Sequence, residues 1–371
     1  MHNNLFIGIN SGTSLDQIDC GLFSFEDNKT ETLGTHSIAF PPELSNTLRN
    51  LSSNSEHKFT LMGLGDSQTK LAMLYGKASQ ALLEQHNIDK NMVTAIGCHG
   101  QTVYHSPVSE PAYTYQLNNG AVIAHITGID TVTDFRSADM AANGQGAPLA
   151  PAFHAKFFSR SAKPTAIVNL GGIANITLLL PNEDIIGFDT GPANCLMDMW
   201  VQKNFDLTLD YNGDIAKSGK IIIGLLNDLL ADAYFNRSHP KSTGVDYFNL
   251  HWLEQYLKDQ YHSPKDIMAT LCELTAISIA NEIQQSSTRI ESVYLCGGGT
   301  NNLHLLNRIQ SHLSNTPIFT TSEFGVDPNW VECALFAWLA KMNIDKQVIN
   351  LSSITGSTHP IILGAYYPAV K

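Results

Sequence analysis

The strongest constraint on the fold of this chain is that the same order of predicted elements occurs twice along it. Residues 5–10 and 18–25 have the pattern of two strands around a Ser/Gly/Thr turn, and residues 166–170 and 174–180 repeat this order around two glycines. In each half, strands then alternate with helices. We therefore predict an α/β fold with two lobes, each a mixed sheet flanked by helices, and a cleft between the lobes.

The remaining elements are expected from the spacing of apolar residues. Helices are expected at residues 59–85, 121–127, 195–204, 215–235, 269–284, 303–313 and 330–342, and short strands at residues 93–98, 131–133, 185–188 and 293–296. A polar link at residues 161–164 marks the boundary between the lobes. We expect an N-terminal lobe of residues 1–163, a C-terminal lobe of residues 164–355, and a last segment, residues 356–371, that packs back onto the first lobe.

Composition and charge narrow the class of protein. The chain of 371 residues exceeds the usual size of one hydrophobic core, in agreement with two lobes. Its 22 Lys and Arg against 34 Asp and Glu give a net charge of −12, which disfavours binding to nucleic acids and to anionic lipid. The six cysteines form no C-x-x-C pair, and neither a signal sequence nor a long apolar run is seen, so we expect a cytoplasmic protein.

Three glycine-rich loops follow predicted strands, where open α/β sheets commonly bind ligands. In the first loop, residues 8–16, small residues let backbone amides approach a phosphate and Asp16 can hold a metal ion, but a plain hairpin turn would explain the same residues. The second loop, Gly171-Gly172, is a weak signal by itself. The third, Gly297-Gly298-Gly299, lies between a strand and a helix and suits a nucleotide. None matches the P-loop or the Rossmann pattern, which argues against both of those folds.

Two charged residues outside these loops are candidates for chemistry. Asp189 follows a predicted strand and can act as a general base, although an Asx turn before a helix would use the same residue. Arg136 either binds a substrate carboxylate through two parallel N–H donors or neutralises its neighbour Asp134.

Four further positions have both a functional and a structural interpretation. His99 and Gln101 follow a predicted strand and are either sugar contacts or structural residues. Glu332 begins a predicted amphipathic helix, where a carboxylate often only offsets the helix dipole. Lys241 is either a phosphate contact or an exposed loop lysine. The order of these signals along the chain is stronger evidence than any one of them.

In that order, the motifs resemble the anhydro-N-acetylmuramic acid kinase family, within the superfamily of sugar kinases, heat-shock ATPases and actin. The resemblance runs from about Gly8 to about Gly364. The matching blocks are Ser11-Gly12-Thr13-Ser14, His99-Gly100-Gln101-Thr102, Asp134-Phe135-Arg136, residues 144–149 and 169–175, Phe188-Asp189-Thr190-Gly191-Pro192, Pro240-Lys241-Ser242-Thr243-Gly244, Gly297-Gly298-Gly299 and Glu332.

The resemblance implies an actin-like ATPase fold with RNase H-like sheets, ATP and Mg²⁺ as cofactors, and a homodimer. It also implies a reaction in which water attacks the anomeric carbon of a 1,6-anhydro sugar and the freed O6 takes the γ-phosphate of ATP. Asp189 then matches the base that activates the water, and Asp16 the metal contact. Ser11, His99, Gln101, Arg136 and Glu332 match substrate-binding positions. The nucleotide positions are Gly12, Thr13, Ser14, Leu15, Asp16, Gln17, Ile18, Asp19, Gly171, Gly172, Gly191, Gly297, Gly298, Gly299 and Asn301.

Some residues depart from the family pattern. Gln17 replaces a usual glycine, and if that position needs a positive φ we expect strain there. Asn118-Asn119, Asn143 and Asn212 are further departures, but asparagine tolerates the left-handed conformation well. Two alternatives therefore stay open: a related sugar or acid kinase with another substrate, and a catalytically impaired homologue that only binds sugar or nucleotide.

Overall fold

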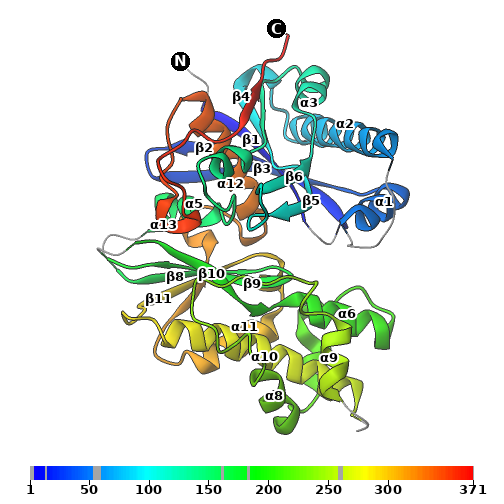
Figure 1. Cartoon of the computed structure of the whole chain (residues 1–371), viewed down its shortest axis with the longest axis vertical. Coiled ribbons are helices and arrows are strands. Elements are labelled where there is room, and N and C mark those ends of the chain that lie inside the picture. Colours follow the sequence, from blue (N-terminus) through cyan, green and yellow to red (C-terminus); the bar gives the residue numbers. More distant parts are fainter. Residues whose placement is uncertain are drawn as a thin grey trace. The chain divides into compact units, whose positions relative to one another are not determined.

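The computed structural model describes residues 4–12, 15–52, 60–159, 163–181, 184–257 and 262–370. The chain divides into two compact units, and each contains its own sheet flanked by helices, so the predicted mixed α/β architecture is confirmed (Figure 1). Unit 1 is Met1–Phe157, Phe324–Val326 and Trp330–Lys371; unit 2 is Phe158–Glu323 and Asp327–Asn329. Residues 330–355, which the sequence placed with the C-terminal lobe, group with unit 1.

The six-stranded sheet of unit 1 has the order β13-β7-β4-β1-β2-β3. The first loop joins an antiparallel pair, as predicted, whereas β1, β4 and β7 run parallel, so their carboxyl ends meet at one edge. The bounds are β1 Leu5–Ser11, β2 Gln17–Glu26, β3 Lys29–Ala39, β4 Val93–Cys98, β7 Thr131–Thr133 and β13 Ala365–Tyr367. The antiparallel pairing of β13 with β7 brings the end of the chain into this sheet.

The other elements of unit 1 are helices and one separate hairpin. The long helix α2, Leu61–Gln85, has its N-cap at Thr60 and buries Leu71 and Tyr75, as the apolar spacing predicted. The hairpin consists of β5, Gln101–Ser106, and β6, Tyr113–Leu117. The remaining helices are α1 Pro42–Ser52, η1 Lys90–Met92, α3 Gly120–Thr127, α4 Ser137–Ala141, α5 Ala150–Phe157, α12 Val331–Ile344 and α13 Ser352–Thr355.

Helix α12 packs directly on β1 and β4 because two glycines leave room for it. A Cβ atom on Gly8 would lie 1.7 Å from the Cys333 carbonyl oxygen, and one on Gly97 would lie 1.9 Å from that of Phe336. The sequence predicted an amphipathic helix here. Instead most of its residues are buried, since it lies between the sheet and α5.

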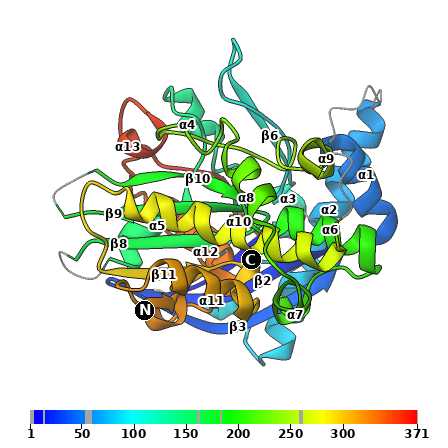
Figure 2. The ribbon, with the colours of Figure 1, turned by 90° about the horizontal axis from the view of Figure 1, so that it is seen from below.

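Unit 2 contains the five-stranded sheet β10-β9-β8-β11-β12. The hairpin predicted for the second half of the chain is β8 with β9, which pair antiparallel. Strand β11 runs parallel to both β8 and β12. The strands are β8 Thr165–Leu170, β9 Ile173–Leu179, β10 Ile186–Pro192, β11 Ser292–Cys296 and β12 Ile318–Thr320. Helix α10, Pro264–Gln284, packs against β9 and β10, and α11, Leu303–His312, packs on α10; both helices lie over the strands in Figure 2.

One predicted helix of unit 2 was wrong. Residues 215–235 form two short helices, α7 Asp214–Ser218 and α8 Ile223–Leu230, followed by irregular chain. The break occurs at Gly219, whose backbone is extended with φ −92° and ψ 175°, and a Cβ there would lie 2.0 Å from the Lys265 carbonyl oxygen in α10. The other elements are α6 Asn194–Phe205, η2 Tyr211–Gly213, α9 Leu250–Leu257, η3 Gly298–Asn301, η4 Thr321–Phe324 and η5 Pro328–Trp330. Among the described helices, none is long and apolar enough to cross a membrane.

Candidate active site

Polar residues of unit 1 gather where its parallel strands end. Asn10 and Ser11 end β1, His99 follows β4, and Arg136 follows β7. Because parallel strands present their carboxyl ends at the same edge, the topology itself brings these side chains together. The sequence motifs identified three of these four residues; Asn10 was missed because a lone asparagine at the end of a strand carries no pattern.

Arg136 and His99 form a fixed pair. The Arg136 Nε–H donates to His99 Nε2 over 3.0 Å, so this nitrogen must accept and the proton of the neutral ring is on Nδ1. The ring also stacks on Phe336 with centroids 4.6 Å apart. Burial, with the charge of Arg136, holds the pKa of His99 well below its usual value. His99 therefore acts as a neutral support for the guanidinium.

Asp139, a residue that the sequence analysis missed, organises the other side of Arg136. Its buried carboxylate accepts hydrogen bonds from the Gly146 amide at 2.7 Å and from the Thr355 hydroxyl at 2.8 Å. The Gly146 carbonyl in turn accepts from Arg136 Nη1 at 2.8 Å. Burial lowers the pKa of Arg136 to about 10, so it stays charged at neutral pH. The motif at residues 144–149 thus places this cation.

Ser11 and Gln101 take part in a buried network. The Ser11 hydroxyl donates to Gln101 Oε1 over 2.9 Å and lies 2.8 Å from the Tyr75 hydroxyl, which makes Tyr75 the donor to Ser11. Gln101 is only 2% exposed. The hydroxyl proton of Ser11 and the side-chain oxygen of Gln101 are therefore already used within the protein, and their contact with a sugar stays a prediction.

Two carboxylates of unit 1 lie close enough to influence each other. Glu332, in the first turn of α12, accepts a hydrogen bond from the Asn10 amide. Glu332 is exposed to solvent, although many protein atoms surround it. Desolvation is the main cause that raises the pKa of Glu332, and the charge of Asp19 is the second. Burial also raises the pKa of Asp19, against hydrogen bonds from Ser37 at 2.6 Å and Gln17 at 2.8 Å. A nearby cation would stabilise the ionised form of each carboxylate and lower its pKa.

The first loop differs in detail from what the sequence predicted. Gly12 precedes Thr13 and Ser14, which lie outside the described residues, and its carbonyl accepts from the Leu15 amide at 3.2 Å. Leu15 and Ile18 are buried in the core of unit 1, so only their backbone can face a ligand.

The condition for strain at Gln17, a positive φ, is not met. Gln17 lies in β2, paired with Ala39, and it is not among the described residues with positive φ. Among the described residues of this loop, Leu15 is left-handed, with φ 56°. Asn143 and Asn212 have positive φ, 65° and 58°, a conformation that asparagine tolerates.

A Mg²⁺ ion in a kinase is typically held by one or two carboxylates together with substrate phosphates and waters. Asp16 is at the surface, its side chain 73% exposed, with Oδ1 3.6 Å from Arg49 Nη2. Within the described ranges, no group of three or more His, Cys, Asp or Glu residues is arranged to hold a metal by itself. The charge of Asp19, which helps to raise the pKa of Glu332, nevertheless fits a cation that arrives with the phosphates.

Asp189 is the central carboxylate of unit 2. It lies within β10 and not after it, at a register shift that separates it from Gly191, whose φ is 148°. Its Oδ2 accepts a hydrogen bond from the Thr243 amide at 2.9 Å, and its carbonyl accepts one from the Tyr234 hydroxyl at 2.7 Å. Desolvation raises the pKa of Asp189 to about 6, although the Thr243 bond opposes the shift. Asp189 thus lies at an irregular point of β10, and the Thr243 amide holds its carboxylate.

Lys241 has neither of the environments considered from the sequence. Its side chain is 2% exposed and its Nζ lies 2.7 Å from Glu282 Oε1, so it is neither a phosphate contact nor an exposed lysine. Beside this segment, a cavity of about 290 Å³ is lined by Tyr234, Arg237, Ser242, Thr243, Gly244, Asp246 and Tyr247. Two of these residues, Tyr234 and Thr243, also donate hydrogen bonds to Asp189.

The second and third glycine loops meet at one edge because β8 and β11 run parallel. A Cβ on Gly297, where φ is 84°, would lie 2.3 Å from Asn169 Oδ1, and one on Gly299 would lie 2.6 Å from Leu170 Cβ. Gly298 faces open space. Only glycine allows this close approach, so the two loops form one backbone-lined surface.

Side-chain amides hold this surface in place. Asn194, another residue missed from the sequence, donates to the carbonyls of Leu170 and Gly171 at 2.9 and 2.8 Å and thereby fixes the turn before Gly172. Asn301 donates to Asn329 Oδ1 at 3.1 Å. Among the described backbone hydrogen bonds, Gly171 and Gly172 act only as acceptors.

Glycine loops at the carboxyl ends of strands, together with a carboxylate of raised pKa, are compatible with phosphoryl transfer. The family model for anhydro-N-acetylmuramic acid kinase matches residues 4–369. The chain is 42% identical over 370 residues to anhydro-N-acetylmuramic acid kinase of Pasteurella multocida strain Pm70, with 99% of this chain and 97% of that protein covered. For the protein of the same name from Idiomarina loihiensis, the identity is 44% over 363 residues, with 97% and 98% covered.

The chain therefore belongs to the anhydro-N-acetylmuramic acid kinase family, and it is a kinase. The resemblance seen in the motifs is confirmed. Among solved structures, component A of the (R)-2-hydroxyglutaryl-CoA dehydratase of Acidaminococcus fermentans is similar with 12% identity and a TM-score of 0.46, covering 90% of this chain and 97% of that one.

Proposed function

We propose that this chain opens 1,6-anhydro-N-acetylmuramic acid with water and phosphorylates O6 with ATP, giving N-acetylmuramic acid 6-phosphate. The observation that carries the proposal is Asp189, a carboxylate held by the Thr243 amide with a pKa raised to about 6. A base with a pKa about one unit below the working pH is mostly ionised and still accepts a proton effectively.

The proposed reaction balances with the chain's own residue as the base. The water oxygen bonds to C1 of the sugar, and Asp189 takes one water proton. The C1–O6 bond breaks and its electron pair stays on O6. The freed O6 then bonds to the γ-phosphorus of ATP, and the bond to the bridging oxygen breaks with its electron pair on ADP. Asp189 finally returns its proton to solvent.

The sugar-side role is proposed for the polar edge of unit 1. Arg136 uses Nε and one proton of Nη1 within the protein, which leaves the edge formed by Nη1 and Nη2 for a carboxylate such as that of a muramic acid. His99 holds the guanidinium, and Glu332 offers an acceptor for a sugar hydroxyl. Ser11 and Gln101 shape the wall behind them.

The nucleotide role is proposed for the backbone of the three glycine loops, since amide groups bind phosphates without needing a positive side chain. Bound Mg²⁺ would neutralise phosphate charge. Asp16 is the proposed contact from the sequence, and Asp19 is a second carboxylate on the same hairpin. This arrangement suits a chain whose net charge is −12.

The biological setting is proposed from the reaction. A kinase for this anhydro sugar serves peptidoglycan recycling and amino-sugar catabolism, where ATP is available in the cytoplasm. We propose a homodimer there, with no nucleic-acid or membrane partner, and light scattering at micromolar concentration would measure its mass.

The direct test is the mass of the product formed from ATP and 1,6-anhydro-N-acetylmuramic acid in water enriched in ¹⁸O. We expect the sugar to gain one phosphoryl group and the elements of one water, with the ¹⁸O label on C1. A gain of the phosphoryl group alone would indicate a kinase acting on an unmodified hydroxyl. Binding of both ligands without any product would instead identify an impaired homologue, and either result would contradict the proposal.

A further inference from the structure

The support of Asp189 comes almost entirely from one irregular segment, residues 231–249, between α8 and α9. Tyr234 donates to the Asp189 carbonyl, the Lys241 carbonyl accepts from the Asp189 amide at 3.1 Å, and the Thr243 amide donates to the Asp189 carboxylate. A segment without helix or strand has few backbone bonds of its own, so something else must hold it in one conformation.

The segment is held by Tyr234 and Phe248, whose rings are buried in the core of unit 2, and by a buried ion pair. Lys241 reaches from the segment to Glu282 near the end of α10, with side chains only 2% and 14% exposed and a separation of 2.7 Å. The Lys241 ammonium also lies 5.1 Å from the centre of the Tyr234 ring. One lysine side chain thus joins α10 to two of the three groups that contact Asp189.

We propose that Glu282 is a positioning residue for Asp189, acting through Lys241 and the backbone of residues 241–243. Glu282 itself makes no contact with Asp189 among the described hydrogen bonds and ion pairs. The inference rests on the proposed function, in which Asp189 is the base. Nothing about the glycine loops or the edge of unit 1 depends on it.

The test replaces Glu282 by Gln, which keeps the size of the side chain and removes its charge. The buried Lys241 loses its partner, so the segment shifts and the Thr243 bond to Asp189 weakens. Because small misplacements near reacting groups are costly, we expect kcat to fall on the order of 10- to 100-fold with the KM for ATP unchanged. Because the Thr243 bond lowers the pKa of Asp189, its weakening should move the acid limb of the kcat profile to higher pH.

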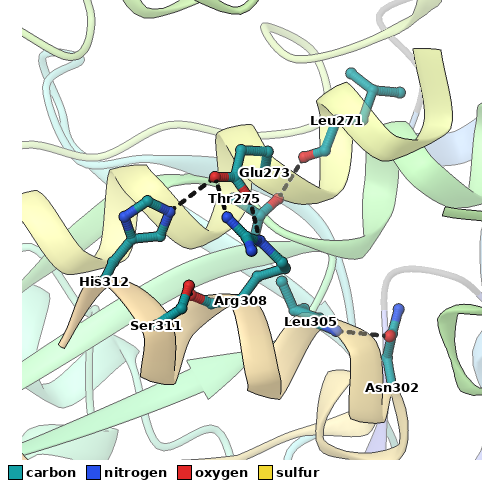
Figure 3. Close-up of polar contacts among 8 residues, drawn as sticks. All are labelled: Leu271, Glu273, Thr275, Asn302, Leu305, Arg308, Ser311 and His312. Atoms are coloured by element: carbon teal, nitrogen blue, oxygen red, sulfur yellow. Dashed lines mark hydrogen bonds and ion pairs between the residues drawn. The ribbon is translucent and has the colours of Figure 1, made fainter. Parts of the chain in front are cut away.

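Glu273→Gln is the matched control on the same helix. Glu273 accepts from Arg308 at 2.6 and 2.7 Å and from His312 at 2.8 Å, in a partly buried cluster between α10 and α11 (Figure 3). This cluster has no described bond to Asp189 or to residues 241–243. We expect Glu273→Gln to lower the melting temperature but to leave kcat and the acid limb in place.

The outcomes separate the inference from the proposed function. A Glu282→Gln enzyme that only melts earlier, with wild-type kcat and acid limb, would overturn the positioning role while Asp189→Asn stayed inactive. If Asp189→Asn kept full turnover, Asp189 would not be the base, and the proposed function would be contradicted rather than the role of Glu282 alone. Should Glu282→Gln not fold, Glu282→Asp keeps the charge on a shorter side chain, and it must show the same shift of the acid limb at smaller amplitude for the inference to stand.

Discussion

At the residue scale, Asp189 shows how a strand residue becomes a candidate base. Its identity was visible in the sequence, in a short motif after apolar residues. Its support was not, because Tyr234 and Thr243 are 45 and 54 residues away and lie in chain without regular structure. Burial of Asp189 raises its pKa, although the Thr243 hydrogen bond opposes the shift, and that burial is a property of the fold.

The raised pKa predicts the pH dependence of the enzyme. A base must be ionised, so kcat/KM should be level above the pKa of about 6 and fall up to tenfold per pH unit below it. The groups around Asp189 are Tyr234, whose own pKa is raised, and the Lys241–Glu282 pair, with Arg237 next to Tyr234. ATP affinity, measured over the same pH range by calorimetry, separates titration of the nucleotide from that of the enzyme. A limb centred near the ordinary value for aspartate, 3.8, would contradict the assignment.

At the element scale, the position of α12 depends on two glycines. Gly8 and Gly97 let the helix backbone approach β1 and β4 at distances that exclude any Cβ. Glu332 begins this helix and meets Asn10 at the end of β1, so the same close packing sets the carboxylate at the polar edge. The packing of one element thus determines the geometry of the unit 1 site.

The change Gly97→Ala should therefore destabilise the protein strongly. The added methyl would meet the Phe336 carbonyl at 1.9 Å, and relief requires a shift of α12, which we expect to cost about 1–3 kcal/mol or more of unfolding free energy. Gly65→Ala in α2 is the control, because its Cβ meets nothing within 4 Å and alanine favours a helix, so stability should rise by up to ~1 kcal/mol. Denaturant unfolding measures both. Equal effects of the two substitutions would contradict this account of the packing.

At the scale of the whole molecule, the sequence predicted the two α/β units and the family well, because strand and helix periodicity and glycine motifs are local signals. It could not predict contacts between residues that are far apart in the sequence. The break at Gly219 lies against residue 265, and the burial of Lys241 depends on Glu282 in α10. The grouping of α12 with unit 1 likewise follows from packing between residues more than 200 positions apart.

The central claim is that Asp189 takes the proton of the attacking water, and the rate of sugar phosphate formation by Asp189→Asn tests it most directly. The substitution should not destabilise the fold at pH 7, because the raised pKa means that ionised Asp189 is disfavoured in the folded state and asparagine carries no charge. We predict a loss of about 10²- to 10⁴-fold in turnover, with ATP affinity and melting temperature retained. Wild-type turnover by a folded Asp189→Asn enzyme would contradict the account.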